Sequence, residues 1–517
     1  MTESLIVVIL GLLAIAAAST VAPRVGVAAP LLLVLTGIGV SFLPFVPDVE
    51  IEPEWILTVV LPPLLYSAAV SMPSMEFRRE FTAIRGLSVV LVVLSALALG
   101  VFFHLVIPDL SLAWGIALGA IVSPTDAVAT SIVKRVGVSG RITAVLEGES
   151  LLNDATALVI LRSAIAATAA SVSVGGVLGD FAFAIAAATA IGFVVGHANV
   201  WVRARVSDPA VNTALSFTVP FLAAVPAEEI GASGLVAAVV AGLATGQHAP
   251  QRLSARHRLS DAQNWRTVEL ILEGGVFLVM GLELSSIVDE AEGQVGTAAA
   301  VAAAALALTL LIRAAYVAPL LVGLGRRARR GERMKPHAMT MQAQLDERDP
   351  EFMAKLVRRS RTRDLEAAVE RLNLRIRRSL ADIDYFLAAP LGWREGVVVV
   401  WAGMRGAVTL AAAQTLPEDT PQRSLLILIA FLVAAGSLIL QGGTLPRVVK
   451  VVRPAPERID PEERVRLDAL LAPHTTIAAR REALLDIRDD GAFSAPVLTA
   501  ALAELDAEEI GIELKTS

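Results

Sequence analysis

The sequence contains no cysteine and few charged residues. Of its 517 residues, 18% are charged and 55% are hydrophobic, and the mean hydropathy is +0.65. A soluble globular protein carries about 25% charged residues, so this composition predicts an integral membrane protein. The lack of cysteine excludes disulfides, thiolate metal sites and thiol catalysis. The formal net charge is only −6, which gives no indication of a nucleic-acid partner.

Long apolar runs divide most of the chain into thirteen predicted spans. An α-helix needs about 20 residues to cross the roughly 30 Å of hydrocarbon in a bilayer. The sequence therefore predicts an all-α polytopic membrane protein. Its spans are predicted at 4–22, 26–46, 54–73, 82–106, 111–133, 142–170, 175–201, 211–226, 231–248, 266–286, 296–323, 396–416 and 424–446.

The charges in the connecting loops predict an orientation. Positive residues mark the cytoplasmic side of a membrane protein, and here basic and acidic loops alternate. The basic loops contain Arg24, Arg78, Arg79, Arg85, Lys134, Arg135, Arg141, Arg203, Arg205, Arg252, Arg256, Arg258 and the run from Arg326. The other loops contain Asp48, Glu50, Glu52, Asp109, Glu228, Glu229, Asp289, Glu290 and Glu292. We expect a multi-pass protein of the cell (inner or plasma) membrane with its N-terminus outside.

The chain divides into a transmembrane domain, a charged insertion and a tail. The transmembrane domain is predicted at 1–450 and is interrupted by a cytoplasmic insertion at 326–395, and a cytoplasmic tail follows at 454–517. Apolar residues recur at helical spacing within the insertion, which predicts an amphipathic helix. That helix either packs on its own loop or is a membrane-surface or regulatory helix. Its apolar positions are Leu365, Val369, Leu372, Ile376 and Leu380.

One apolar span carries carboxylates in the stretch EGESLLNDATALV. Ser150 and Asp154 are four residues apart and share a helical face, while Glu149 and Asn153 form a second such pair beside them. An ionised carboxylate at the bilayer centre costs about 2.5–3.5 kcal/mol on insertion scales. A polar stripe at this depth therefore indicates a functional cavity. Glu273, in ILEGGVFLVMGLEL, is a further intramembrane acid that either lines the cavity or contacts another helix.

Proline and glycine interrupt two of the predicted spans. In IVSPTDAVA, Pro124 removes a backbone donor and disfavours helix at the preceding residue, which frees carbonyls beside Thr125 and Asp126. Broken backbone at membrane depth is tolerated where it is buried or lines a cavity. The second interruption, in WAGMRGAVTLAAA, contains Gly403, Arg405 and Gly406.

Broken helices in corresponding halves of the chain, with carboxylates at mid-membrane, predict an inverted-repeat secondary transporter. Arg313 lies in the apolar run ALTLLIRAAYVAPLL, and a cation there needs a carboxylate partner. The sequence contains no GxxxxGK[ST] motif, so nothing points to ATP as the energy source.

These segments resemble the monovalent cation/proton antiporters, in the branch of NhaP-type bacterial and NHE-type animal sodium/proton exchangers. SPTDAVA and GESLLNDA carry the resemblance, with LPPLLYSAA before them and GMRGAVTLA after, and it covers about residues 1–450. It implies thirteen helices in inverted repeats, with two crossed discontinuous helices. It also implies a homodimer in which a core domain moves against a dimerisation domain.

The resemblance also implies roles for residues around the first break. Asp154 corresponds to the essential aspartate that binds the ion and carries the proton, and Asp126 to the aspartate of the crossed helix. The Thr125 carbonyl and the Ser150 hydroxyl correspond to neutral ligands, so Na⁺ is expected at these four residues. Asn153 completes the expected cation-binding set and forms the Asn-Asp pair of electroneutral members.

Other positions follow from the same resemblance. Glu149 and Arg313 correspond to a buried structural ion pair. Ser67, in LPPLLYSAAV, departs from the family, because many bacterial relatives have an acidic residue there. The crossing of the two broken helices is assigned to Pro124, Gly403, Arg405 and Gly406.

The expected function is Na⁺/H⁺ antiport, with Li⁺ as a further cation. Burial disfavours a charged carboxylate and a bound cation favours it, so proton and cation compete for Asp154 and Asp126. With Asn153 neutral, one proton per Na⁺ is expected, which makes the exchange electroneutral. No cofactor is expected, and the expected partners are membrane lipid, a second copy of the chain and the transported ions.

Three other functions are compatible with intramembrane carboxylates. K⁺/H⁺ exchange by the same fold is the main alternative, because carboxylates and hydroxyls do not by themselves select the ion. A cation channel or a transport-inactive sensor also remains open. Membrane aspartyl proteases need YD and GxGD motifs, and neither occurs, since Val177 stands where GGVLGD would need glycine.

Overall fold

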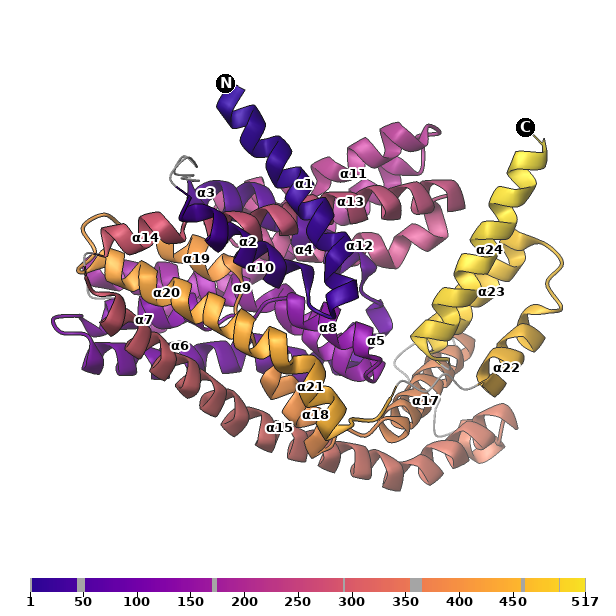
Figure 1. Ribbon diagram of the computed structural model, residues 1–517. Coiled ribbons are helices and arrows are strands. Elements are labelled where there is room, and N and C mark those ends of the chain that lie inside the picture. The colour runs from indigo at the N-terminus through magenta and orange to yellow at the C-terminus, as the bar shows by residue number, and fades with distance from the viewer. Residues whose placement is uncertain are drawn as a thin grey trace. The chain divides into compact units, whose positions relative to one another are not determined.

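Helices make up the regular structure of the protein (Figure 1). The structure, a computed structural model, describes residues 2–43, 52–169, 174–291, 293–353, 365–456, 461–491 and 493–516. Within these ranges there is no β-strand, so the all-α prediction is confirmed. Of the loop acids used to predict the orientation, Asp48, Glu50 and Glu292 lie outside the described ranges, as do the ends of two predicted spans, 44–46 and 170.

The chain forms two compact units. The first comprises 1–317 and 397–454, and the second comprises 318–396 and 455–517. The insertion and the tail, which are separate in the sequence, thus belong to one unit. The helices of the first unit are α1 (Thr2–Val25), α2 (Ala29–Ser41), α3 (Pro53–Trp55), the π-helix η1 (Ile56–Val60), α4 (Leu61–Ser71), α5 (Ser74–Arg85), η2 (Gly86–Leu91), α6 (Val92–Val106), α7 (Leu112–Val122), α8 (Val128–Val136), α9 (Gly140–Ala169), α10 (Val174–Arg203), α11 (Pro209–Glu229), α12 (Gly234–Arg252), α13 (Ala255–Leu282), α14 (Leu284–Glu290), α19 (Ala407–Gln414), α20 (Arg423–Ser437), η3 (Leu438–Gly442) and α21 (Gly443–Val452).

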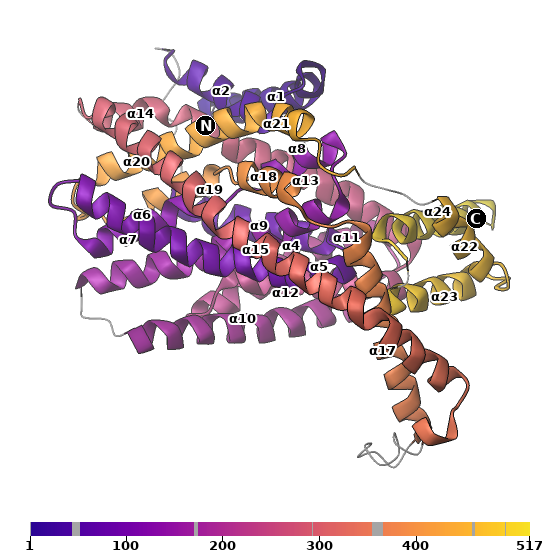
Figure 2. The same ribbon diagram turned by 90° about the horizontal axis from the view of Figure 1, so that it is seen from below.

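Two helices belong to both units, and four belong to the second alone. The shared helices are α15 (Val295–Asp346) and α18 (Trp393–Trp401). The second unit also contains α17 (Leu365–Ala388), α22 (Pro461–Leu471), α23 (Ile477–Asp490) and α24 (Ala495–Thr516). Figure 2 shows α22, α23 and α24 side by side. Arg481 of α23 pairs with Asp506 of α24 at 2.9 Å, so ion pairs join the tail helices.

Nine helices of the described ranges are long and apolar enough to cross a membrane. Helices occupy each of the thirteen predicted spans, but the predicted number is not confirmed. One reason is that the spans at 111–133 and 396–416 are each divided into two short helices, α7 with α8 and α18 with α19. A second is that α2 has only 13 residues within the predicted span 26–46. The first unit is therefore a multi-pass membrane bundle with two interrupted helices.

Candidate functional site

The two interrupted helices contact each other at their breaks. The α7 helix ends at Val122 and α8 begins at Val128, with Pro124 in the non-helical stretch between them. The second break separates α18 from α19. The backbone N–H of Asp126 in the first break donates a hydrogen bond to the carbonyl of Met404 in the second, with an N···O distance of 2.8 Å. Segments nearly 280 residues apart in the sequence thereby form one centre.

Arg405 supplies hydrogen-bond donors to carbonyls that the breaks leave without helical partners. Its side chain is 2% exposed. The guanidinium donates to the carbonyl of Val122 at 2.8 Å, to that of Ser123 at 3.4 Å, and to that of Gly403. These carbonyls lie at the C-terminal ends of α7 and α18, where the helix dipole favours a cation. Arg405 therefore holds the two breaks together through both hydrogen bonds and charge.

Two glycines permit the close approach of side chains at the second break. A Cβ atom at Gly406 would lie 1.3 Å from Oδ2 of Asp126, and one at Gly403 would lie 2.6 Å from Cδ of Arg313. Both distances are far below van der Waals contact, so any larger residue must displace a charged side chain. In the segment GMRG, Gly406 therefore packs against Asp126 and Gly403 packs against Arg313.

Glu149 and Arg313 form a buried ion pair between α9 and α15. Nη2 of Arg313 lies 2.8 Å from Oε2 of Glu149, and Nη1 contacts the other carboxylate oxygen. Nε of Arg313 donates to the carbonyl of Val399 at 2.9 Å, and the Thr125 hydroxyl donates to Glu149 at 2.9 Å. Both charged side chains are almost fully buried. Every charged group in this pair is neutralised and hydrogen-bonded.

Asn153 connects α9 to the first break. Its Nδ2 donates to the carbonyl of Thr125 at 2.6 Å and to the hydroxyl of the same residue at 3.0 Å. Its Oδ1 accepts a hydrogen bond from the backbone N–H of Asp154 at 2.7 Å. The side chain is fully buried and does not line the cavity described next. In this conformation Asn153 thus donates to a carbonyl in the non-helical first break, rather than presenting its oxygen to a cavity.

A cavity of about 170 Å³ brings most of the candidate residues together. Its walls come from α4, the α7–α8 break, α9, α13 and the start of α19. Asp154 is 9% exposed, and no hydrogen bond or ion pair to a described residue holds its carboxylate. Oδ1 of Asp126 accepts a hydrogen bond from the backbone N–H of Val128, at 3.1 Å. The candidate residues that line the cavity are Pro124, Thr125, Asp126, Ser150, Asp154 and Gly406.

Two acids on α13 also line this cavity. Glu273 is one of them, in line with one of its two sequence interpretations, and Glu269, one helical turn away, was missed. The i, i+4 spacing of these two glutamates was the signal that could have found it. In the described part of the chain, no three His, Cys, Asp or Glu side chains lie close enough together to hold a metal ion. The four carboxylates therefore line the cavity without converging on one point.

Ser67 is buried but does not line the cavity. The α4 helix contributes only apolar side chains to the wall, so α13 supplies the acidic groups that face the aspartates. The α4 residues at the wall are Leu61, Leu64, Leu65 and Ala68.

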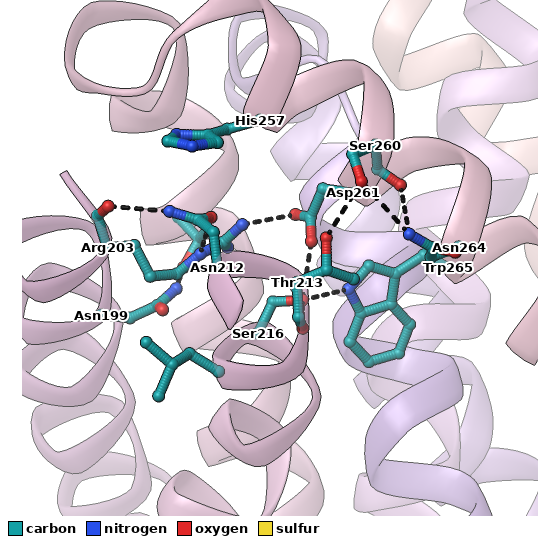
Figure 3. Close-up of polar contacts among 12 residues, drawn as sticks. Asn199, Arg203, Asn212, Thr213, Ser216, His257, Ser260, Asp261, Asn264 and Trp265 are labelled. Carbon is teal, nitrogen blue, oxygen red and sulfur yellow. Dashed lines mark hydrogen bonds and ion pairs between the residues drawn. The ribbon is translucent and has the colours of Figure 1, made fainter. Parts of the chain in front are cut away.

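A buried polar cluster holds the part of α13 that precedes its two glutamates in the sequence (Figure 3). Nη2 of Arg203 on α10 lies 3.0 Å from Oδ2 of Asp261 on α13, and Nε of Arg203 donates to Oδ1 of Asn212 on α11 at 2.8 Å. The Ser216 hydroxyl donates to Asp261 at 2.7 Å, and Nε1 of Trp265 donates to that hydroxyl oxygen at 2.9 Å. Arg203 is 1% exposed although the sequence placed it among loop charges. We call these five residues the Arg203 cluster.

Comparison with known proteins places this geometry in a family. The family profile described as "Sodium/hydrogen exchanger, transmembrane" matches residues 9–341 and 376–451. An uncharacterized Na⁺/H⁺ exchanger of Mycobacterium tuberculosis is 29% identical over 465 residues, which are 87% of this chain and 74% of that protein. A "Sodium, potassium, lithium and rubidium/H(+) antiporter" of Bacillus pumilus is 30% identical over 297 residues, which are 54% of this chain and 43% of that protein.

The fold is also similar to a solved structure. The sodium proton antiporter MjNhaP1 of Methanocaldococcus jannaschii at pH 8 matches with a TM-score of 0.61 and 16% identity, over 87% of this chain and 99% of that one. This likeness concerns the fold, and the profile match over most of the chain concerns the family. The chain is a transporter rather than an enzyme, and it belongs to the sodium/hydrogen exchanger family.

Proposed function

We propose that this protein exchanges Na⁺ or Li⁺ for H⁺ by competition of the two ions for Asp154 and Asp126. The observation that carries the proposal is the Asp154 carboxylate, which is nine-tenths buried, lines the cavity and has no hydrogen-bond or ion-pair partner among the described residues. A buried carboxylate of this kind needs either a proton or a cation to offset its charge. Alternating access of the cavity to the two sides of the membrane then couples the two fluxes.

The ligands available to a cation are oxygens from both sides of the first break. The Asp126 and Asp154 carboxylates, the Ser150 hydroxyl and the Thr125 carbonyl supply hard oxygen donors that can replace the hydration shell of a small cation. The Thr125 carbonyl already accepts from Asn153, and a carbonyl oxygen has a second lone pair for a cation. Asn153 thus orients this ligand, and it adds no charge.

Because Asn153 is neutral, the proposed exchange at Asp154 and Asp126 moves one proton per cation, without net charge. The charge of Glu149 is offset by Arg313, so Glu149 is not counted among the proposed ion ligands. A strong dependence of the exchange rate on an imposed voltage would contradict the one-to-one ratio.

K⁺/H⁺ exchange is the second candidate for the same site. It is favoured by the Bacillus pumilus relative, whose name includes potassium and rubidium besides sodium and lithium. The oxygen ligands of the cavity do not by themselves decide between these cations. The exchange experiment with Na⁺, Li⁺ and K⁺ therefore has to distinguish the two candidates.

The experiment is ion exchange in proteoliposomes. Acid-interior vesicles containing a pH dye receive Na⁺, Li⁺ or K⁺ outside, with wild-type protein and with Asp154→Asn. We expect Na⁺ and Li⁺ to collapse the gradient with wild type, and the variant to match protein-free vesicles. Equal activity of Asp154→Asn and wild type would remove Asp154 from the mechanism, and activity with K⁺ alone would establish the second candidate.

The assembly and orientation form part of the proposal. We propose a homodimer in the cell membrane, with the N-terminus outside and both the insertion and the tail in the cytoplasm. The alternation of basic and acidic loops supports this orientation. Single cysteines introduced at loop positions test this orientation through their labelling by an impermeant reagent, in intact cells and in inside-out vesicles. The native absence of cysteine removes background labelling.

A further inference from the structure

The cavity has two chemically different sides. On one side the α7–α8 break, α9 and α19 carry Asp126 and Asp154. On the other side, α4 contributes only apolar residues, and α13 contributes Glu269, Glu273, Val276 and Phe277. The two glutamates are the only ionisable residues that α4 or α13 brings to the cavity within the described chain.

We propose that Glu269 and Glu273, the α13 acid pair, draw the cation into the cavity and raise its affinity for Asp154 and Asp126. The pair acts by its negative charge, which lowers the energy of a cation anywhere in the cavity. This inference rests on the proposed function, because it assigns the α13 acid pair to the same cation site.

The local geometry supports this role. Glu269 and Glu273 are one turn apart on one helical face, where like charges repel. Both are half-buried, and neither forms a hydrogen bond or an ion pair with a described residue. No Lys or Arg lines the cavity in the described part of the chain. A structural role would need a positive partner, whereas a cation-attracting role needs these charges to stay uncompensated.

An independent observation points to a ligand in the same space. The Asp154 carboxylate opposite the α13 acid pair is nine-tenths buried, lines the same cavity and has no hydrogen-bond or ion-pair partner among the described residues. An anionic cavity with a buried, unpaired carboxylate on one side and two half-buried ones on the other suits a small cation. It disfavours an anion or a neutral solute.

The Arg203 cluster fixes where the α13 acid pair lies. Trp265 precedes Glu269 by one turn, and Asp261 precedes Trp265 by another, so both anchor the same helix. Their partners are on α10 and α11, which contribute no residue to the cavity. Contacts outside the cavity therefore fix the rotation of the helix that carries the two glutamates. A binding site needs such support, because its charges must be held at fixed distances from the ion.

The first experiment compares the Na⁺ dependence of exchange for wild type, Glu269→Gln, Glu273→Gln and the double variant. We expect the half-saturating Na⁺ concentration to rise about fivefold for Glu273→Gln, less for Glu269→Gln and most for the double variant, because each change removes one negative charge from the cavity. Glu273→Asp keeps the charge and should restore the affinity. An unchanged half-saturating concentration in the double variant overturns the proposal.

Glu283→Gln is the matched control. Glu283 follows the last residue of α13 and is 3% exposed, but it does not line the cavity. Nε2 of Gln414 donates to its Oε2 at 3.0 Å, and a glutamine oxygen can accept the same hydrogen bond. We expect the half-saturating concentration to stay at the wild-type value. A rise equal to that of Glu273→Gln would mean that any buried glutamate has this effect, and would overturn the proposal.

A binding measurement separates this proposal from the proposed function. Thermal unfolding of the purified protein is followed as Na⁺ is added, with choline as the ionic-strength control, because a ligand that binds the folded state stabilises it. We expect Na⁺ to stabilise wild type, and about fivefold more Na⁺ to be needed for Glu273→Gln. Failure of wild type to exchange ions contradicts the proposed function, whereas the same Na⁺ requirement in wild type and the double variant, or no stabilisation by Na⁺, contradicts the role of the α13 acid pair.

Discussion

The cavity and the Arg203 cluster both bury charged and polar groups between long helices, but they balance charge differently. In the cluster, Arg203 pairs with Asp261, and neutral hydrogen-bonding groups surround the pair. In the cavity, carboxylates from two sides face one space that no described Lys or Arg lines. Paired charge holds helices in place, and unpaired charge at membrane depth remains available to an ion.

The same contrast occurs within a single helix. On α9, Glu149 is neutralised by Arg313, while Asp154, five residues later, has no such partner. Asn153, which lies between them in the sequence, joins the helix to the first break through its side chain. One helix thus provides both a fixed attachment and part of the proposed site for the cation and the proton.

The largest expected effect comes from leaving a structural charge without its partner. Arg313→Ala leaves Glu149 as a buried carboxylate without its cationic partner. Breaking a buried ion pair in this way lowers the free energy of unfolding by about 3–5 kcal/mol. We expect a low yield of folded protein, measured by size-exclusion chromatography of detergent extracts. Neutralising Glu149 as well, in Arg313→Ala with Glu149→Gln, should partly restore the yield. If the double variant is no better than the single one, the pair does not have this role.

The second largest effect is expected from moving the Asp126 carboxylate, and this change should leave the fold intact. Gly406→Ala places a Cβ atom where the Asp126 carboxylate lies, so that carboxylate must rotate away from the N–H of Val128. We expect the Na⁺/H⁺ exchange rate in proteoliposomes to fall about tenfold or more, with the thermal unfolding temperature near that of wild type. Gly436→Ala is the control, because a Cβ atom there meets no other atom within 4 Å. Normal exchange by Gly406→Ala would contradict the close packing of the two breaks.

The smallest effect should come from the Arg203 cluster. Asp261→Asn removes the partner of Arg203 but keeps a group that can hydrogen-bond to Ser216 and to the guanidinium. We expect a loss of stability of about 1–3 kcal/mol, seen as a lower unfolding temperature. The half-saturating Na⁺ concentration should change little in the molecules that remain folded. A large change in Na⁺ affinity without loss of stability would show that the cluster itself takes part in ion binding.

Several features of the fold and the site were predictable because they depend on local sequence. Pro124 cannot continue the hydrogen bonding of a helix, so the break after Val122 follows from residue chemistry alone. The spacing of Ser150 and Asp154 likewise places both on one side of α9, and both line the cavity. The number of crossing helices does not follow from apolar length alone, because the broken helices and the 13-residue α2 are shorter than a single membrane-spanning helix.

Other features depend on contacts between distant segments. Nothing in the vicinity of Arg405 indicates that its guanidinium binds the carbonyls of Val122 and Ser123. Glu269 shares a helical face with Glu273 by its i, i+4 spacing, but only the packing of α13 shows that this face lines the cavity. Asn153 was expected at the cation, and its contact with Thr125 became visible only when α9 and the first break were placed together.

The sequence by itself determined that this protein is a multi-pass helical membrane protein, where two of its helices break, and that Asp126, Glu149 and Asp154 lie in apolar spans. These follow from hydropathy, from backbone chemistry and from helical periodicity, all of which act over short stretches of chain. The tertiary structure decided which charges are paired and which are not. Pairing depends on the packing of helices from opposite ends of the chain, and that packing separates Glu149, held by Arg313, from Asp154, which lines a cavity opposite the α13 acid pair.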